Sequence, residues 1–205
     1  MKKMLTAFAA FAVIAACSAP ESVAQVVGKP APNFKAADVN GKPVTLSDFR
    51  GKTVVLEWNN PDCPFVQKHY GSGNMQKAQA AAAKDGVVWL TINSGAPGKQ
   101  GHMSGPEAKA FLAKAGARPT AYLLDPRGVV GKAYDAKTTP HMYIVNKAGT
   151  LVYAGGIDDK PTAKPADING ARNHVLAALS DIKTGKAVSV ATSRPYGCSV
   201  KYSDS

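Results

Sequence analysis

Short runs of apolar residues recur along the chain and predict the strands of a sheet. The predicted strands are residues 54–58, 87–92, 121–124, 142–145 and 151–154. The first two runs are almost continuously apolar, as expected for strands that are covered on both faces. The last two are joined by a polar, glycine-ending segment, which predicts an antiparallel hairpin. Asn40-Gly41 gives a further hairpin signal near the start of the chain.

Segments with helical patterning separate these strands. The predicted helices are residues 64–84, 106–115, 129–134 and 173–184. The first is interrupted at Gly71–Gly73, and the last carries an apolar stripe formed by Val175, Leu176, Leu179 and Ile182. Strands that alternate with helices predict an α/β fold in which helices flank a central mixed sheet.

The first 24 residues have the pattern of an export signal. Two lysines precede an apolar stretch, Leu5–Ala16, that is too short to span a bilayer. Cleavage after residue 24 would leave a domain of residues 25–205. A lipobox-like segment ending at Cys17 offers a second route, in which residues 1–16 are removed and Cys17 receives a lipid. Both routes predict a periplasmic or otherwise extracytoplasmic protein.

Composition and charge narrow the function classes. The 205 residues are 45% hydrophobic, which is sufficient for a globular core. The formal net charge is +11, but the lysines are scattered and form no run longer than a pair. We therefore predict no nucleic-acid partner. Contact with a membrane is expected only if Cys17 is lipidated.

A cysteine stands where the first core strand gives way to the first helix. Cys63 follows the 54–58 run, and Pro64 fits the first helical turn because its missing N–H removes no hydrogen bond there. Free N–H groups and the positive end of the helix dipole favour a thiolate at such a position. The alternative is that Cys63 is a small buried apolar residue.

Two segments resemble the thioredoxin superfamily. Val54–Val66 is similar to its strand, turn, cysteine and helix element, and Thr139-Pro140 is similar to the cis-proline pair that opens a later strand. The resemblance implies a thioredoxin fold with an N-terminal hairpin and a mid-chain insertion. It also implies a cis bond before Pro140, which the sequence alone would not predict.

The C-terminal tail makes this resemblance more specific. Thr192–Tyr202, which ends in Gly-Cys-Ser-Val-Lys-Tyr, and Tyr153–Asp159 are similar to two segments of peroxiredoxin-like redoxin proteins of the AhpC/TSA type. The likeness extends from about Gly28 to Tyr202. It implies an exported, thiol-dependent redox protein, either peroxiredoxin-like or a thiol–disulfide oxidoreductase.

The resemblance implies roles for six residues. Cys63 is the expected reactive thiol, and Cys198 is the expected resolving thiol. The expected substrate contacts are Asn60, Trp58, Thr139 and Pro140, although Trp58 reads equally well as a core strand residue. The partners implied are a peroxide or a protein thiol or disulfide, together with an extracytoplasmic thiol reductant.

The chain also departs from the patterns of both groups. Asn60 replaces the attacking cysteine of a C-x-x-C motif and the Thr or Ser of peroxiredoxins. Leu56 stands where peroxiredoxins carry a proline. These departures put efficient peroxide reduction in doubt.

Two alternatives remain open. A permanent Cys63–Cys198 disulfide would make the protein a redox-inert binding module. Copper handling is a third class, because His69, His102-Met103 and His141-Met142 supply ligand types, but their spacing matches no compact metal motif. We predict no metal and no other cofactor.

Overall fold

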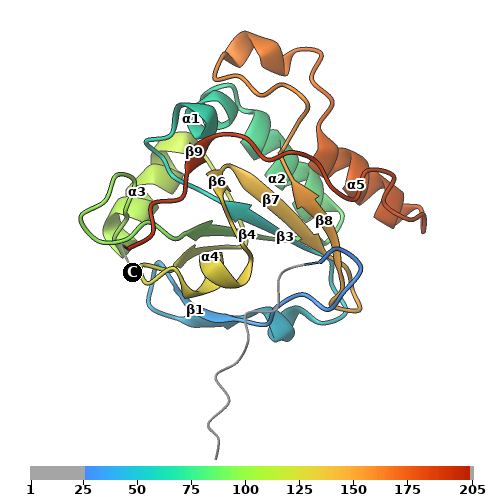
Figure 1. Ribbon diagram of the computed structural model, residues 1–205, viewed down its shortest axis with the longest axis horizontal. Coiled ribbons are helices and arrows are strands. Elements are labelled where there is room, and N and C mark those ends of the chain that lie inside the picture. Colours follow the sequence, from blue (N-terminus) through green and yellow to red (C-terminus); the bar gives the residue numbers. More distant parts are fainter. Residues whose placement is uncertain (1–25, 204–205) are drawn as a thin grey trace, which may run out of the picture.

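The computed structural model describes residues 26–203, and its centre is a seven-stranded mixed sheet (Figure 1). The strand order is β2-β1-β5-β4-β3-β7-β8, and a separate two-stranded sheet pairs β6 with β9. The strands are β1 (Lys35–Asp38), β2 (Pro43–Thr45), β3 (Val54–Trp58), β4 (Val88–Asn93), β5 (Ala121–Leu124), β6 (Thr138–Thr139), β7 (His141–Val145), β8 (Leu151–Gly155) and β9 (Cys198–Ser199).

The central strands of the sheet are parallel, and the strands at its two edges are antiparallel to their neighbours. β3, β4 and β5 are parallel, in the register Leu56 to Leu90 and Leu90 to Ala121. β7 runs antiparallel to β3, and β8 completes the predicted hairpin with β7. β1 and β2 form the predicted N-terminal hairpin at the other edge. Parallel neighbours need crossover helices, which explains the alternation seen in the sequence.

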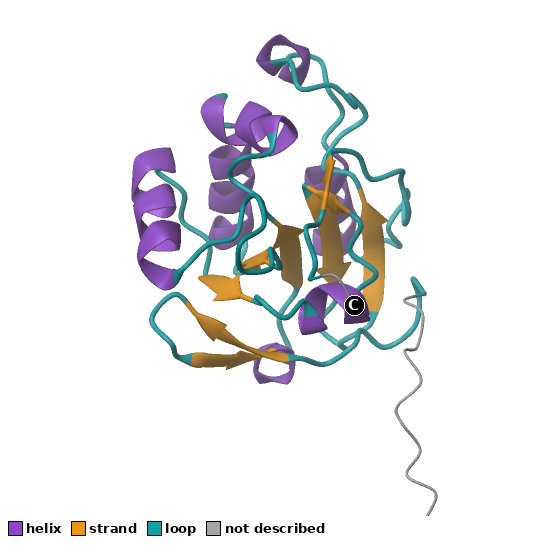
Figure 2. Cartoon of the chain, turned by 60° about the vertical axis from the view of Figure 1, so that its left-hand side comes forward, coloured by secondary structure: helices purple, strands orange, loops and turns teal. Residues whose placement is uncertain are grey.

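The helices pack around the layer of strands (Figure 2). They are α1 (Pro64–Gly71), α2 (Asn74–Lys84), α3 (Gly105–Ala115), α4 (Val129–Ala133) and α5 (His174–Lys183), with short 3-10 helices at Leu46–Phe49 and Pro165–Ile168. α3 begins with a capping box between Ser104 and Glu107, and the side chain of Asn173 caps α5. Gly73 has a φ of 73°, and this left-handed position divides α1 from α2.

The two faces of the sheet bury separate cores. Successive residues of β3 alternate between them, since side chains of a strand point to opposite faces. Val55 joins the core beneath α1, α2 and α5, which also contains Cys63. Leu56 and Trp58 join the core on the other face, which also contains Val130 of α4. The site described below therefore lies on the α1 side of the sheet.

The structure confirms the predicted mixed sheet flanked by helices. The predicted break of the first helix is present, and most element ends agree within one residue. The small sheet of β6 and β9 was not predicted, because two-residue strands leave no periodic pattern. The proposed signal and Cys17 lie outside the described residues. No helix within residues 26–203 is long and apolar enough to cross a membrane.

Candidate active site

Cys63 is the N-cap of α1. The loop after β3 closes in a tight turn, in which the Cys63 N–H donates to the Asn60 carbonyl at 3.0 Å and the Asn60 side-chain oxygen accepts from the Asp62 N–H at 2.9 Å. The Cys63 carbonyl then accepts the first helical bond from Gln67 at 2.9 Å. This turn brings the thiol to the start of the helix, where its side chain is fully buried.

The Thr139–Pro140 peptide bond is cis, as the resemblance implied. It lies directly against the thiol, because Cys63 Sγ is 3.0 Å from the Thr139 carbonyl oxygen. In its protonated form the thiol donates to this carbonyl. The strand β3, the start of α1 and the segment before β7 therefore meet at one sulfur atom.

Cys198 reaches the same place from the end of the chain. In the β6–β9 sheet, Cys198 is paired with Thr139. Its backbone N–H donates to Cys63 Sγ at 3.4 Å, although 135 residues separate the two cysteines. Both cysteines are free thiols in the structure, Cys63 buried and Cys198 partly exposed.

Gly197 permits this close approach. Its φ is 133°, and a Cβ atom at this position would lie 2.0 Å from the Thr139 carbonyl oxygen. Only glycine combines this backbone conformation with this contact. Steric fit therefore explains why the tail motif has a glycine at position 197.

The site differentiates the two thiols. Burial raises the pKa of Cys63, but hydrogen bonds from the Cys198 thiol, the Thr139 side chain and nearby backbone N–H groups outweigh burial, so the net pKa is lowered. Burial raises the pKa of Cys198 to about 11, with further contributions from the hydrogen bond to Cys63 and from its charge. Cys63 is accordingly the thiol that ionises first, which suits it to attack.

The remaining predicted contacts lie at different distances from the thiol. Asn60 is buried beside the site, and its amide is occupied by Asp62 and by Gln100, with Nδ2 to Oε1 at 3.5 Å. Trp58 is fully buried on the opposite face of the sheet, where its Nε1 donates to Ser94 Oγ at 3.1 Å. Trp58 is therefore a core residue, as its alternative interpretation predicted, and it does not contact the Cys63 thiol.

An open groove borders the tail beside the site. Phe65, Thr138, Tyr196 and Gly197 are among the residues that line it. It adjoins the residues on either side of the paired thiols, Phe65 after Cys63 and Gly197 before Cys198.

The histidines considered as ligands are dispersed. Burial lowers the pKa of both His69 and His141 to about 4, so both are neutral at neutral pH. His69 bonds to Tyr196 and Asn74, and His141 contacts Tyr143. In the described part of the chain, no group of three or more His, Cys, Asp or Glu side chains is arranged to hold a metal ion.

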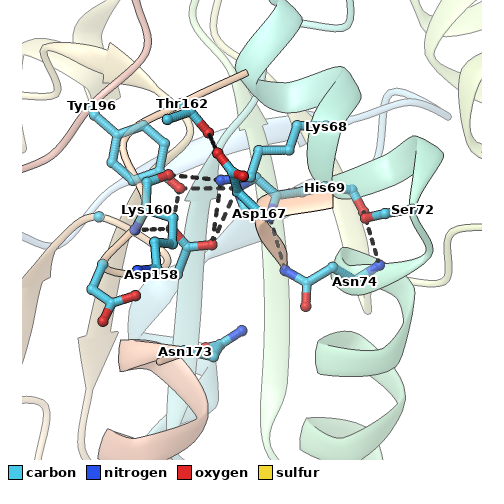
Figure 3. A network of polar contacts seen from close by, with 12 residues as sticks. Lys68, His69, Ser72, Asn74, Asp158, Lys160, Thr162, Asp167, Asn173 and Tyr196 are labelled. Atoms are coloured by element: carbon cyan, nitrogen blue, oxygen red, sulfur yellow. Dashed lines mark hydrogen bonds and ion pairs between the residues drawn. The ribbon is translucent and has the colours of Figure 1, made fainter. Parts of the chain in front are cut away.

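A buried polar network adjoins the site, and the sequence reasoning missed it (Figure 3). Lys68 Nζ lies 3.6 Å from Asp158 Oδ2, with both side chains at most 1% exposed. The Tyr196 hydroxyl donates to Asp158 and lies 3.1 Å from His69 Nε2. Asp158 and Tyr196 fall within segments that resemble the redoxin pattern, but Lys68 has the appearance of an ordinary surface lysine in the sequence.

The family model described as AhpC/TSA family matches residues 27–154, which include β1 to β7, all but the last residue of β8, Cys63 and the cis-proline. The chain belongs to the AhpC/TSA family. The match ends before the tail, so it covers Cys63 but not Cys198.

The chain is also similar to individual proteins. Over 139 residues the chain is 27% identical to the thiol-disulfide oxidoreductase ResA of Bacillus subtilis, covering 64% of this chain and 67% of that protein. A conserved protein of Geobacillus kaustophilus is 30% identical, with a TM-score of 0.76 over 88% of this chain and 94% of that one. A hypothetical protein of Sinorhizobium meliloti 1021 is 25% identical, with a TM-score of 0.73 over 88% and 96%. These neighbours have the thioredoxin fold, which confirms the fold class predicted from the sequence.

Proposed function

We propose that this AhpC/TSA family member is an exported thiol–disulfide oxidoreductase that uses Cys63 as the attacking thiol and Cys198 as the resolving thiol. The observation that carries the proposal is the pairing of Cys198 with Thr139, which brings two free thiols of different pKa together beside the cis-proline. The relative in Bacillus subtilis carries the name thiol-disulfide oxidoreductase, which supports the same reaction class.

The proposed cycle has two exchange steps. The Cys63 thiolate attacks one sulfur of a partner disulfide, so a mixed disulfide forms and the other partner sulfur leaves and takes up a proton. Cys198 then loses its proton and attacks the Cys63 sulfur, which releases the second partner thiol. The partner gains two electrons and two protons and becomes a dithiol, and this chain loses them and is left with a Cys63–Cys198 disulfide. An extracytoplasmic dithiol returns the pair to its reduced state and becomes a disulfide itself.

The neighbouring residues have supporting roles in this proposal. Thr139 and Pro140 shape the edge along which an extended partner segment aligns its disulfide with Cys63. Asn60 closes the turn that places Cys63 at the start of α1.

Peroxide is a second candidate oxidant, favoured by the family match over residues 27–154. The Cys63 thiolate would attack one peroxide oxygen, so that an S–O bond forms as the O–O bond breaks and water leaves. Condensation of the resulting sulfenic acid with Cys198 would release a second water and give the same disulfide.

A trapping experiment tests the proposal. The full chain carrying Cys17→Ser keeps only Cys63 and Cys198, and it is reduced and then mixed with a synthetic peptide disulfide or with hydrogen peroxide. We expect mass spectrometry to find a Cys63–Cys198 disulfide with either oxidant, together with two equivalents of peptide thiol when the peptide disulfide is used. Cys198→Ser should accumulate a mixed disulfide on Cys63 with the peptide and a sulfenic acid on Cys63 with peroxide, whereas Cys63→Ser should not react.

Ser199→Ala serves as the matched control, because it alters the same strand of the tail and leaves both thiols in place. It should behave as the parent chain. Full turnover by Cys198→Ser would exclude the resolving role. An unreactive Cys63 towards both oxidants would exclude the redox function as a whole.

A further inference from the structure

The tail strand occupies the edge that the proposed function assigns to a substrate. Thr138 and Thr139 pair with Ser199 and Cys198, and Thr139 Oγ1 also donates to the Cys198 carbonyl at 3.4 Å. Cys63 is fully buried, and the tail contacts its sulfur directly through the Cys198 N–H at 3.4 Å. A partner of any size reaches the sulfur only when this part of the tail moves away.

One residue anchors the tail in the protein interior. Among residues 186–203, Tyr196 alone is buried. Its ring packs edge-on against Phe65, the second residue of α1, with centroids 5.8 Å apart. Its hydroxyl enters the polar network between α1 and the loop after β8. Tyr196 precedes Cys198 by two residues, so the position of its backbone determines where Cys198 lies.

The hydrogen bonds of this network run in one direction. Asn74 Nδ2 donates to His69 Nδ1 at 2.8 Å, so the neutral imidazole carries its proton on Nε2 and donates to the Tyr196 hydroxyl at 3.1 Å. The hydroxyl in turn donates to Asp158. Both hydrogen-bonding capacities of the hydroxyl are therefore used, which holds the ring in one orientation (Figure 3).

The charged end of the network is itself held in place. The Lys160 backbone N–H donates to Asp158 Oδ1 at 3.0 Å, and Lys68 Nζ donates to the Lys160 carbonyl at 2.7 Å. The carboxylate thus keeps partners of its own when the tyrosine hydroxyl is absent. Removal of the hydroxyl alone should loosen the tail without leaving a bare buried charge.

We propose that Tyr196 is a positioning residue whose contact with the buried Lys68–Asp158 pair and His69 fixes Cys198 over Cys63 and controls access to the Cys63 thiol. The tail opens when the Tyr196 hydroxyl leaves this network, and it closes when the hydroxyl returns. The inference rests on the proposed function in one respect only: if Cys63 reacts with a partner, that partner takes the place of the tail. The control of access itself requires no redox activity.

Alkylation of Cys63 tests the proposal directly. In the full chain carrying Cys17→Ser and Cys198→Ser, Cys63 is the sole thiol, and its rate of reaction with iodoacetamide reports how often the tail opens. We expect Tyr196→Phe to raise this rate about tenfold to a hundredfold, the range given by one hydrogen bond to a charged group lost from the closed state. The pH midpoint of thiolate absorbance should also rise in Tyr196→Phe with Cys198 retained, because a departing tail removes donors from the sulfur.

Tyr134→Phe is the matched control. Tyr134 is fully buried in the core on the other face of the sheet, and its hydroxyl donates to the Pro32 carbonyl at 2.8 Å, so the variant loses one tyrosine hydrogen bond outside the Tyr196 network. It should lower the melting temperature by a similar amount and leave alkylation of Cys63 unchanged. Equal alkylation rates in the parent chain and in both variants would overturn the proposal, as would equal acceleration in both variants.

The outcomes also separate this inference from the proposed function. If Tyr196→Phe exposes Cys63 but the parent chain exchanges no disulfide, the positioning role stands and the proposed function fails. If the parent chain exchanges disulfides while Tyr196→Phe changes neither alkylation nor the thiolate midpoint, the positioning role fails and the proposed function stands.

Discussion

At the scale of single residues, the proposed reaction depends on the different pKa values of the Cys63 and Cys198 thiols. Cys63 has hydrogen bonds that stabilise its thiolate, and Cys198 has burial and a neighbouring negative charge that oppose ionisation. The position of Cys63 between strand and helix could be predicted from hydrophobic patterning. Its contact with Cys198 could not, because a separation of 135 residues gives no local signal, and only the resemblance of the tail suggested it.

The difference between the thiols predicts an ordered titration. In the reduced chain carrying Cys17→Ser, pH-dependent alkylation at Cys63 should have a midpoint below the free value of about 8.5. The midpoint at Cys198 should lie near 11, as burial and the Cys63 charge raise its pKa. Mass spectrometry of each labelled peptide measures both. Equal midpoints, or a lower one at Cys198, would contradict the assignment of attacking and resolving thiols.

At the scale of elements, the small β6–β9 sheet assembles the site. It joins the segment before the cis-proline to a tail that the hydrophobic pattern left without structure. The large sheet and its helices could be predicted because their periodicity extends over many residues. The pairing of two-residue strands depends on steric fit at Gly197 and on the anchor at Tyr196, neither of which has a periodic signature.

Gly197→Ala should detach this small sheet. The added Cβ would collide with the Thr139 carbonyl oxygen, and the φ of 133° would be strained in alanine. We expect Cys63–Cys198 disulfide formation to slow about tenfold or more and alkylation of Cys63 to accelerate. Thiol counting after a peroxide or peptide-disulfide pulse measures the first effect.

Gly185→Ala is the control for Gly197→Ala. Gly185 also has a positive φ, of 71°, but no atom lies within 4 Å of its added Cβ. This variant should lose about 1 kcal/mol of stability from backbone strain and form the disulfide at the rate of the parent chain. Equal slowing of disulfide formation in both variants would indicate a general loss of stability in place of a local role for β9.

At the scale of the whole molecule, two buried neutral histidines couple folding to pH. Burial lowers the pKa of His69 and His141 to about 4, whereas an unfolded histidine titrates near 6.5. Between these values the unfolded chain binds more protons than the folded chain. The stability that the neutral histidines contribute is therefore fully present above about 6.5 and is lost as the pH falls towards 4.

Denaturant unfolding across this window checks the coupling. The free energy of unfolding should decrease with falling pH by up to about 1.4 kcal/mol per pH unit for each histidine. In His69→Gln, the contribution of His69 to the pH dependence of the free energy of unfolding should be lost, and the contribution of His141 should remain. A slope that His69→Gln leaves unchanged would contradict the burial of a neutral imidazole at this position.

The reduction potential of the Cys63–Cys198 pair distinguishes a redox-active pair of thiols from a structural disulfide. The full chain carrying Cys17→Ser is equilibrated in dithiol–disulfide buffers of graded potential, and the oxidised fraction is measured by thiol labelling. A redox pair should give a potential between about −120 and −270 mV, the range of exchange proteins. A value below about −300 mV would instead mark a structural disulfide and would support the redox-inert binding module.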